Sequence, residues 1–237
     1  MRISGLLKQT LVDYPGEVAA TVFTQGCNLR CPFCHNGHLV TRPGKTQNDY
    51  MDEQMVLDFL AERQGFLDAL VITGGEPTLH QDLPSFIAKV KDLGFLVKLD
   101  TNGTNLLMLE FLLDQKLLDY VAMDIKAPVE IKAYQNACGN LSLEDFFNIR
   151  NSLNLLKNAD IKVEFRTTVI PSLHSSEDII NIAKYITGAK LYTIQQFNPE
   201  VTLDVNYEKV LPYDKKDMEL IAKKCRAYVE IVRVINI

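Results

Sequence analysis

Three cysteines that lie close together are the residues with the clearest potential for chemistry. Cys27, Cys31 and Cys34 form a C-x-x-x-C-x-x-C pattern within eight residues. Soft thiolates at this spacing suit zinc or an iron–sulfur cluster. A structural zinc site needs a fourth ligand, which would have to be His35, His38 or a distant cysteine.

Two further interpretations of this segment leave Cys27 without a role. The run Cys31-Pro-Phe-Cys34-His35 fits the C-x-x-C-H pattern of c-type haem attachment, and its C-x-x-C part fits a thioredoxin-like redox pair. The remaining interpretation is a four-iron cluster held by three thiolates. One iron is then open to another ligand, and an open position is what distinguishes a catalytic metal site from a structural one.

The cysteine spacing, with the aromatic Phe33 before the last cysteine, resembles the hallmark of the radical S-adenosylmethionine (SAM) superfamily. This resemblance implies that Cys27, Cys31 and Cys34 bind one [4Fe-4S] cluster, with Phe33 beside the cofactors. It implies that SAM chelates the open iron through its amino and carboxylate groups. The reduced cluster would then cleave SAM to methionine and a 5′-deoxyadenosyl radical, which abstracts hydrogen.

A second motif, Gly74-Gly75-Glu76, ends another predicted strand after Thr73. Glycines allow the backbone to approach a ligand closely, and Glu76 can accept a hydrogen bond from an ammonium group. Taken alone, the segment is equally typical of a plain turn with an acid at a helix N-terminus. The family resemblance implies that these three residues hold the amino group of SAM.

Polar residues also end the next two predicted strands. Asp124 and Lys126 are two residues apart, so they share a face and could form a structural ion pair. Asp100 and Asp124 would lie on adjacent strand ends, and two carboxylates facing one spot need a cation. Activating enzymes of glycyl-radical proteins have similar segments around the SAM carboxylate and ribose, with a bound monovalent cation. This similarity implies SAM-binding roles for Asp100, Thr101, Asn102, Asp124 and Lys126, with a cation at the two aspartates.

The last two predicted strands supply two more candidate residues. Arg166 shares a strand face with Glu164 and needs an anion, which is either Glu164 or the SAM carboxylate. Asn198 follows the last of these strands, where the superfamily often has a histidine near SAM. The resemblance therefore adds Arg166 and Asn198 to the cofactor-binding residues.

Several segments are similar to one subgroup, the anaerobic ribonucleoside-triphosphate reductase activating proteins. They are residues 11–16 (LVDYPG), 24–27 (TQGC), 100–103 (DTNG) and 123–128 (MDIKAP). The resemblance runs from about residue 5 to residue 199. It implies hydrogen abstraction from a glycine of a partner glycyl-radical enzyme, an anaerobic ribonucleotide reductase, with a flavodoxin or ferredoxin as electron donor. The alternative is a radical SAM enzyme that acts on a small molecule such as a purine or pterin precursor.

Alternating strand and helix patterns must position these groups. Six β/α units in a row predict a parallel sheet with right-handed crossovers, and periodicity alone fits a doubly wound sheet or a barrel. Both place functional groups at the carboxyl ends of the strands. The resemblance implies an α/β fold, a partial (β/α)6 TIM-like barrel. The predicted strands are 17–24, 67–73, 95–99, 119–125, 161–169 and 190–197, and the predicted helices are 52–64, 82–93, 105–116, 142–158, 176–187 and 213–228.

The composition is that of one globular domain. The 237 residues are 47% hydrophobic and 23% charged, so we expect a single domain over 1–237 with its core at about 17–199 and a terminal helix and strand at about 213–237. A net charge of −5 argues against general nucleic-acid binding. Neither a spanning segment nor a signal peptide is indicated, which predicts a cytoplasmic protein and no membrane partner. Cys138 and Cys225 are expected to be ordinary thiols, and His80 and His174 to be surface residues.

Overall fold

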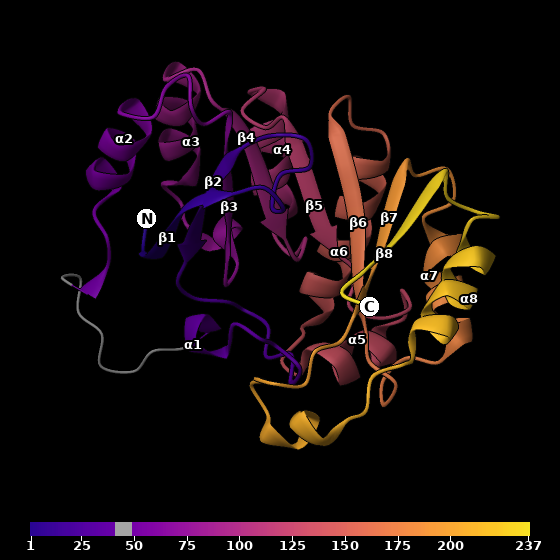
Figure 1. The fold of residues 1–237 in the computed structure, drawn as a ribbon. Helices are drawn as coiled ribbons and strands as arrows, with labels where there is room; N and C mark the ends of the chain where they lie inside the picture. The colour runs from indigo at the N-terminus through magenta and orange to yellow at the C-terminus, as the bar shows by residue number, and fades with distance from the viewer. Residues whose placement is uncertain (41–48) are drawn as a thin grey trace.

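The computed structural model describes residues 1–40 and 49–237, and its framework is one curved eight-stranded sheet (Figure 1). The strands lie in the sheet in the order in which they occur in the chain. The first pair is antiparallel and every later pair is parallel. The strands are β1 (Ile3–Thr10), β2 (Ala19–Thr24), β3 (Ala69–Gly74), β4 (Leu96–Thr101), β5 (Tyr120–Asp124), β6 (Lys162–Val169), β7 (Leu191–Gln196) and β8 (Ile231–Ile235).

Helices connect the parallel strands and lie along the outer side of the sheet (Figure 1). Two of them begin with a capping box, in which Ser142 pairs with Asp145 and Ser175 pairs with Asp178. Among the described residues, no helix is both long and apolar enough to cross a membrane. The helices are α1 (Gly37–Val40), α2 (Glu53–Ala61), α3 (Leu83–Asp92), α4 (Leu106–Asp114), α5 (Ile131–Cys138), α6 (Leu143–Lys157), α7 (Ser176–Tyr185) and α8 (Lys215–Cys225), with 3-10 turns η2 (Pro77–Leu79) and η3 (Val205–Lys209).

The expected partial barrel is confirmed, with the six predicted strands appearing as β2–β7. Three elements lie outside that prediction, one of which is the short helix α1. β1 precedes the β/α units and pairs antiparallel with β2, while α5 is an extra helix between β5 and α6. At the other edge, β8 pairs with β7 and extends the same sheet.

The turn between β1 and β2 closes the amino-terminal end of the barrel. Tyr14 is buried, and its ring meets that of Tyr120 edge-on at 5.4 Å between centroids. The Lys162 ammonium lies 5.7 Å from the Tyr14 ring centroid, and Thr21 donates a hydrogen bond of 2.7 Å to Asp13. The Asp-Tyr-Pro-Gly segment therefore places an aromatic plug beneath the lumen, which leaves the carboxyl ends of the strands as the accessible end.

Candidate functional site

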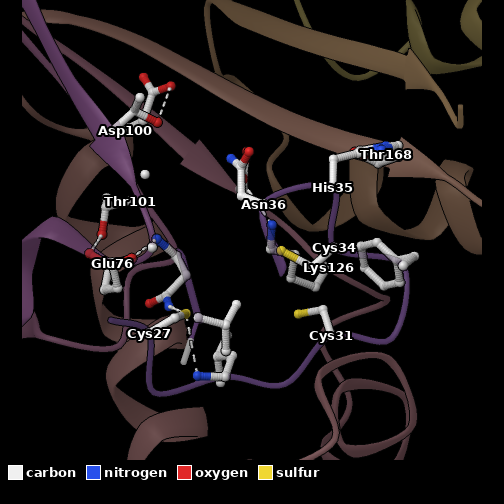
Figure 2. Close-up of a pocket in the computed structure, with 18 of the residues that line it drawn as sticks. Cys27, Cys31, Cys34, His35, Asn36, Glu76, Asp100, Thr101, Lys126 and Thr168 are labelled. Carbon is white, nitrogen blue, oxygen red and sulfur yellow. Dashed lines mark hydrogen bonds and ion pairs between the residues drawn. The ribbon is translucent and has the colours of Figure 1, made fainter. Parts of the chain in front are cut away.

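A cavity of about 270 Å³ opens at the carboxyl ends of the strands, where the fold predicts a site (Figure 2). Its walls come from the loop after β2 and from the ends of β3 to β7. All but one of the site residues predicted from the sequence line it. They are Cys27, Cys31, Phe33, Cys34, Gly74, Gly75, Glu76, Asp100, Thr101, Asn102, Asp124, Lys126 and Arg166.

The loop after β2 carries all three motif cysteines to this cavity (Figure 2). Two N–H groups point at the Cys27 sulfur, the backbone amide of Leu29 at 3.4 Å and the Asn102 side-chain amide at 3.9 Å. Burial raises the pKa of the Cys27 thiol to about 12. Such donors stabilise a thiolate, so the sulfur is prepared for a metal that displaces its proton.

Cys138, expected to be an ordinary thiol, does not line the cavity but lies beside the cysteine loop. It is fully buried at the end of α5, and its thiol hydrogen-bonds with Cys31. This hydrogen bond lowers the pKa of Cys31 and raises that of Cys138. The Cys138 carbonyl also accepts from the Arg30 amide at 2.8 Å, so the end of α5 is tied to the cysteine loop.

The donor set fits a cluster better than one metal ion. Among residues 1–40 and 49–237, no three His, Cys, Asp or Glu side chains converge on a point that could hold a single ion. A closed zinc site requires such convergence. In a four-iron cluster each thiolate binds its own iron, so three cysteines around one cavity are sufficient.

The Gly74-Gly75 pair allows two strand ends to touch. A Cβ on Gly75 would lie 2.0 Å from the Gly26 carbonyl oxygen, and one on Gly74 would lie 2.4 Å from the Thr24 amide nitrogen. Gly74 also has a φ of +121°, which side-chain-bearing residues rarely adopt. The amide of Glu76 donates to Gly26 at 2.8 Å. The glycines therefore position the cysteine loop, a role that the sequence prediction of close ligand approach did not include.

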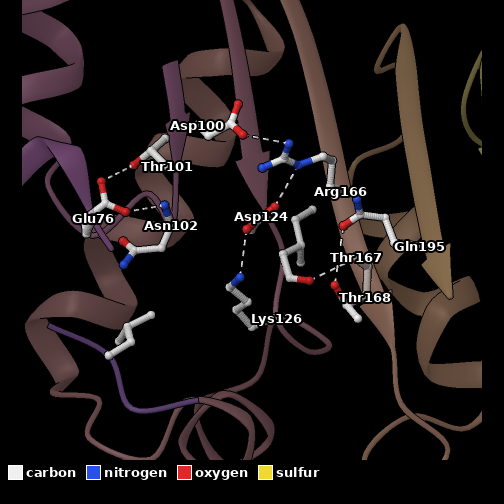
Figure 3. Close-up of polar contacts among 12 residues, drawn as sticks. Glu76, Asp100, Thr101, Asn102, Asp124, Lys126, Arg166, Thr167, Thr168 and Gln195 are labelled. Carbon is white, nitrogen blue, oxygen red and sulfur yellow. Dashed lines mark hydrogen bonds and ion pairs between the residues drawn. The ribbon is translucent and has the colours of Figure 1, made fainter. Parts of the chain in front are cut away.

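Glu76 joins the ends of β3 and β4 (Figure 3). Its carboxylate is completely buried and accepts from Thr101 Oγ1 at 2.7 Å, from the Asn102 amide at 2.7 Å and from Thr78 Oγ1 at 2.6 Å. Burial raises its pKa, and these donors oppose that rise. Oε2 accepts only the Asn102 amide among the described groups, so it retains capacity for one more donor from the cavity.

Five charged groups form a continuous network beside Glu76, and Figure 3 shows four of them, Asp100, Asp124, Lys126 and Arg166. Arg166 bridges both aspartates, with Nη1 3.0 Å from Asp100 and Nε 2.9 Å from Asp124. Lys98 pairs with Asp100 at 2.7 Å and Lys126 pairs with Asp124 at 2.8 Å. The guanidinium thus lies between the two carboxylates, at the place where the sequence predicts a bound cation.

Within the protein, the anionic partners of Arg166 are Asp100 and Asp124. Glu164, one of the two anions expected for it, instead accepts from Tyr120 at 3.1 Å and from Thr193. Burial alone would raise the pKa of Asp124, but Arg166 and Lys126 outweigh it and hold that pKa well below the usual range. The two carboxylates therefore stay ionised and hold the Arg166 and Lys126 side chains at the cavity.

Asn198 is the predicted residue that does not line the cavity. It is exposed and its side chain bonds to Glu200. Gln195 and Thr168 line the cavity instead, on neighbouring strands. Both could have been predicted from the sequence, because Thr168 lies on the same strand face as Arg166 and Gln195 lies at the end of β7.

Two histidines expected at the surface are buried. His174 accepts from the Ile170 amide at Nδ1 and donates from Nε2 to the Lys126 carbonyl at 2.9 Å. His80 contacts the Gln25 carbonyl at 3.2 Å. Both therefore fix the backbone of loops that carry site residues, and burial lowers the pKa of each.

Known proteins of similar sequence belong to the radical SAM superfamily and include enzymes named as activating enzymes. The sequence model of the radical SAM superfamily matches residues 21–186. A provisionally named glycyl-radical enzyme activating enzyme of Methanocaldococcus jannaschii is 36% identical over 99% of this chain and 96% of its own length. The pyruvate formate-lyase-activating enzyme of Clostridium pasteurianum is 30% identical over 97% of this chain and 95% of its own length.

The fold also has solved counterparts. A radical SAM methyltransferase from Sphaerobacter thermophilus superposes with a TM-score of 0.68. The superposition covers 93% of this chain and 67% of that one, at 16% sequence identity. This likeness shows a shared fold, and fold alone does not fix the reaction.

Proposed function

Since this chain belongs to the radical SAM superfamily, we propose that it activates a glycyl-radical enzyme, an anaerobic ribonucleoside-triphosphate reductase, by removing a hydrogen atom from one glycine. The chain is a radical SAM enzyme and uses a [4Fe-4S] cluster with SAM. The single observation that carries the activase proposal is that relatives with activating-enzyme names match along almost the whole chain.

The residues around the cavity fit both cofactors. Cys27, Cys31 and Cys34 would hold the cluster, because they are the thiolates on one loop and donors already point at Cys27. When bound, the reduced cluster supplies the electron that cleaves SAM, which gives the radical that takes hydrogen from the substrate. The chain's part is to bind, orient and enclose the reacting groups.

The polar residues divide the binding of SAM between them. Glu76 offers Oε2 to the SAM ammonium group, because its other oxygen is already satisfied. Arg166 and Lys126 present cationic donors to the SAM carboxylate, and Asp100 and Asp124 hold those cations in place. Thr168 and Gln195 complete the opposite wall.

The reductase as partner is supported by the segments that resemble its activating proteins. Tyr14 supports it in part, since the Asp-Tyr-Pro-Gly segment belongs to that resemblance and here forms the barrel plug. The alternative substrate, a small purine or pterin precursor, requires a pocket that encloses it. A protein glycine requires only an open side through which a loop can enter.

Electron paramagnetic resonance tests the proposal. Reduced protein, SAM and the anaerobic reductase of the same organism are mixed under argon. A doublet, split by one α-proton and carried by the reductase, is expected. SAM cleavage without that doublet, together with turnover of a purine or pterin, would support the alternative.

A further inference from the structure

The barrel is open between its two edge strands, and β8 leaves one side of its backbone unpaired. β8 pairs only with β7 in the described part of the sheet. The Ile231 amide donates to the Lys190 carbonyl at 3.0 Å. In a parallel ladder alternate residues face the same neighbour, so Arg233 and Ile235 also face β7. The amides of Val232 and Val234 therefore point toward the opening.

The end of β8 lines a second cavity, of about 310 Å³, through Arg233 and Ile235, which alternate along the strand with Val232 and Val234. One wall comes from the β1–β2 turn, with Val12 and Asp13, and the facing wall comes from the end of β8. The cavity shares Asp100, Arg166 and Gln195 with the candidate site. A chain that follows the edge of β8 would therefore reach the place where the SAM-binding residues lie.

Within the described part of the chain, this edge lacks a proline and a paired neighbour, although β8 is only five residues long and carries the inward-facing charge of Arg233. Arg233 lines the second cavity, is exposed and forms no ion pair with any described residue. Val12, 82% exposed across the opening, adds an apolar contact for a bound segment.

We propose that the glycine-bearing segment of the partner enzyme binds as an extended strand along the free edge of β8. Main-chain hydrogen bonds from Val232 and Val234 would supply affinity, as in other cases of strand addition. A glycine has no Cβ, so its Cα can come closest to the shared end of the two cavities. The added strand would also close the barrel and exclude water. This inference rests on the proposed function and names how its substrate is held.

A proline at position 234 tests the main-chain contact. Val234→Pro removes an amide that faces the opening and leaves the β7 ladder intact, and proline is tolerated on such an edge. Val234→Ala is the matched control, because it shortens the same side chain and keeps the amide. We expect Val234→Pro to raise the KM for the reductase about tenfold or more, since a carbonyl of the partner loses its donor. The Ala variant should stay near the wild type, and SAM cleavage without reductase should be unchanged in both.

Hydrogen exchange on the wild-type protein provides a second measurement that needs no variant. The amides of Val232 and Val234 should exchange at least about tenfold more slowly when the reductase is added, because they become hydrogen-bonded. The amide of Ile231, already bonded to β7, serves as the internal reference.

The outcomes separate this inference from the proposed function. A normal KM for Val234→Pro, or unprotected amides at 232 and 234 while the reductase is still activated, overturns the inference alone. Absence of a glycyl radical with the wild-type protein overturns the proposed function, and the inference with it. A homodimer that Val234→Pro dissociates would show that a second copy of this chain occupies the edge, which also overturns the inference.

Discussion

Gly75 lies against Gly26 so closely that a single added methyl group would meet the Gly26 carbonyl oxygen at 2.0 Å. Gly26 immediately precedes Cys27, and the Glu76 amide donates to that same carbonyl. The end of β3 and the start of the cysteine loop are thus held in one fixed relation. Any change that separates them would move Cys27, a proposed ligand of the cluster.

Gly75→Ala should therefore damage both stability and the site. Overpacking against backbone costs about 1–3 kcal/mol or more, because the backbone cannot rotate away as a side chain can. Thermal unfolding of anaerobic apo-protein and iron content after reconstitution measure the two effects. Gly5→Ala is the control, since its Cβ would meet only Phe23 at 4.0 Å. Equal behaviour of the two variants would show that the contact is not tight.

Each of the single variants Cys27→Ala, Cys31→Ala and Cys34→Ala should lose the cluster. The wild-type protein should hold about four irons per chain after anaerobic reconstitution, because one four-iron cluster is bound. Cys138→Ala removes only a hydrogen bond to Cys31 and should keep the iron, as should Cys225→Ala. Iron content and absorbance provide the measurement. One zinc per chain and no iron-dependent absorbance would contradict the cluster.

Lys126→Ala should weaken SAM binding by about ten- to a hundredfold and leave the iron content intact. The lost charge-assisted contact is worth roughly 1.5–3 kcal/mol, and removing Lys126 also leaves Asp124 Oδ2 without its ion-pair partner, while Oδ1 keeps Arg166. Equilibrium binding of SAM to reconstituted protein measures this. Lys184→Ala, which removes an exposed pair with Glu177, is the matched control. Unchanged SAM affinity would make Lys126 and Asp124 a purely structural pair.

Stability of the apo-protein should fall as the pH drops below about 6.5. Burial lowers the pKa of His174, so the unfolded chain binds a proton there that the folded chain does not. Protonation at Nδ1 would also set a donor against the Ile170 amide. The free energy of unfolding should lose up to about 1.4 kcal/mol per pH unit per buried histidine.

His174→Gln isolates this contribution. The variant should be less stable near neutral pH, because the hydrogen bond to Lys126 is disturbed, and its unfolding free energy should depend less on pH. His80, whose pKa burial also lowers, keeps the remaining dependence. Urea titrations at several pH values measure it. An unchanged slope in the variant would show that folding does not lower the pKa of His174.

The sequence predicted the framework well because periodicity and strand-end residues reflect local rules. Six strands read as β-branched runs, and the polar residues that follow them line one cavity, since parallel strands end at one edge. β1 was not predicted because its residues, ISGLLKQT, lack a clear alternation of apolar and polar side chains. Its position depends on pairing with β2, which is a tertiary contact.

The missed site features are those that only the folded chain creates. Cys138 is 104 residues beyond Cys34 in the sequence, and the chain path of α5 brings it to Cys31. The pairing of Arg166 with Asp100 and Asp124 could not be read from one strand, where Glu164 was the visible partner. The burial of His174 could not be predicted either, because it depends on contact with the Lys126 carbonyl, which is 48 residues away in the sequence.

Following the abstracted hydrogen atom shows directly whether a glycine of the reductase is the substrate. Reductase labelled with α-deuterated glycine is incubated with reduced protein and SAM, and the 5′-deoxyadenosine produced is analysed by mass spectrometry. We expect one deuterium per 5′-deoxyadenosine, formed in step with the glycyl radical. Unlabelled 5′-deoxyadenosine, formed while the reductase stays inactive, would contradict this expectation.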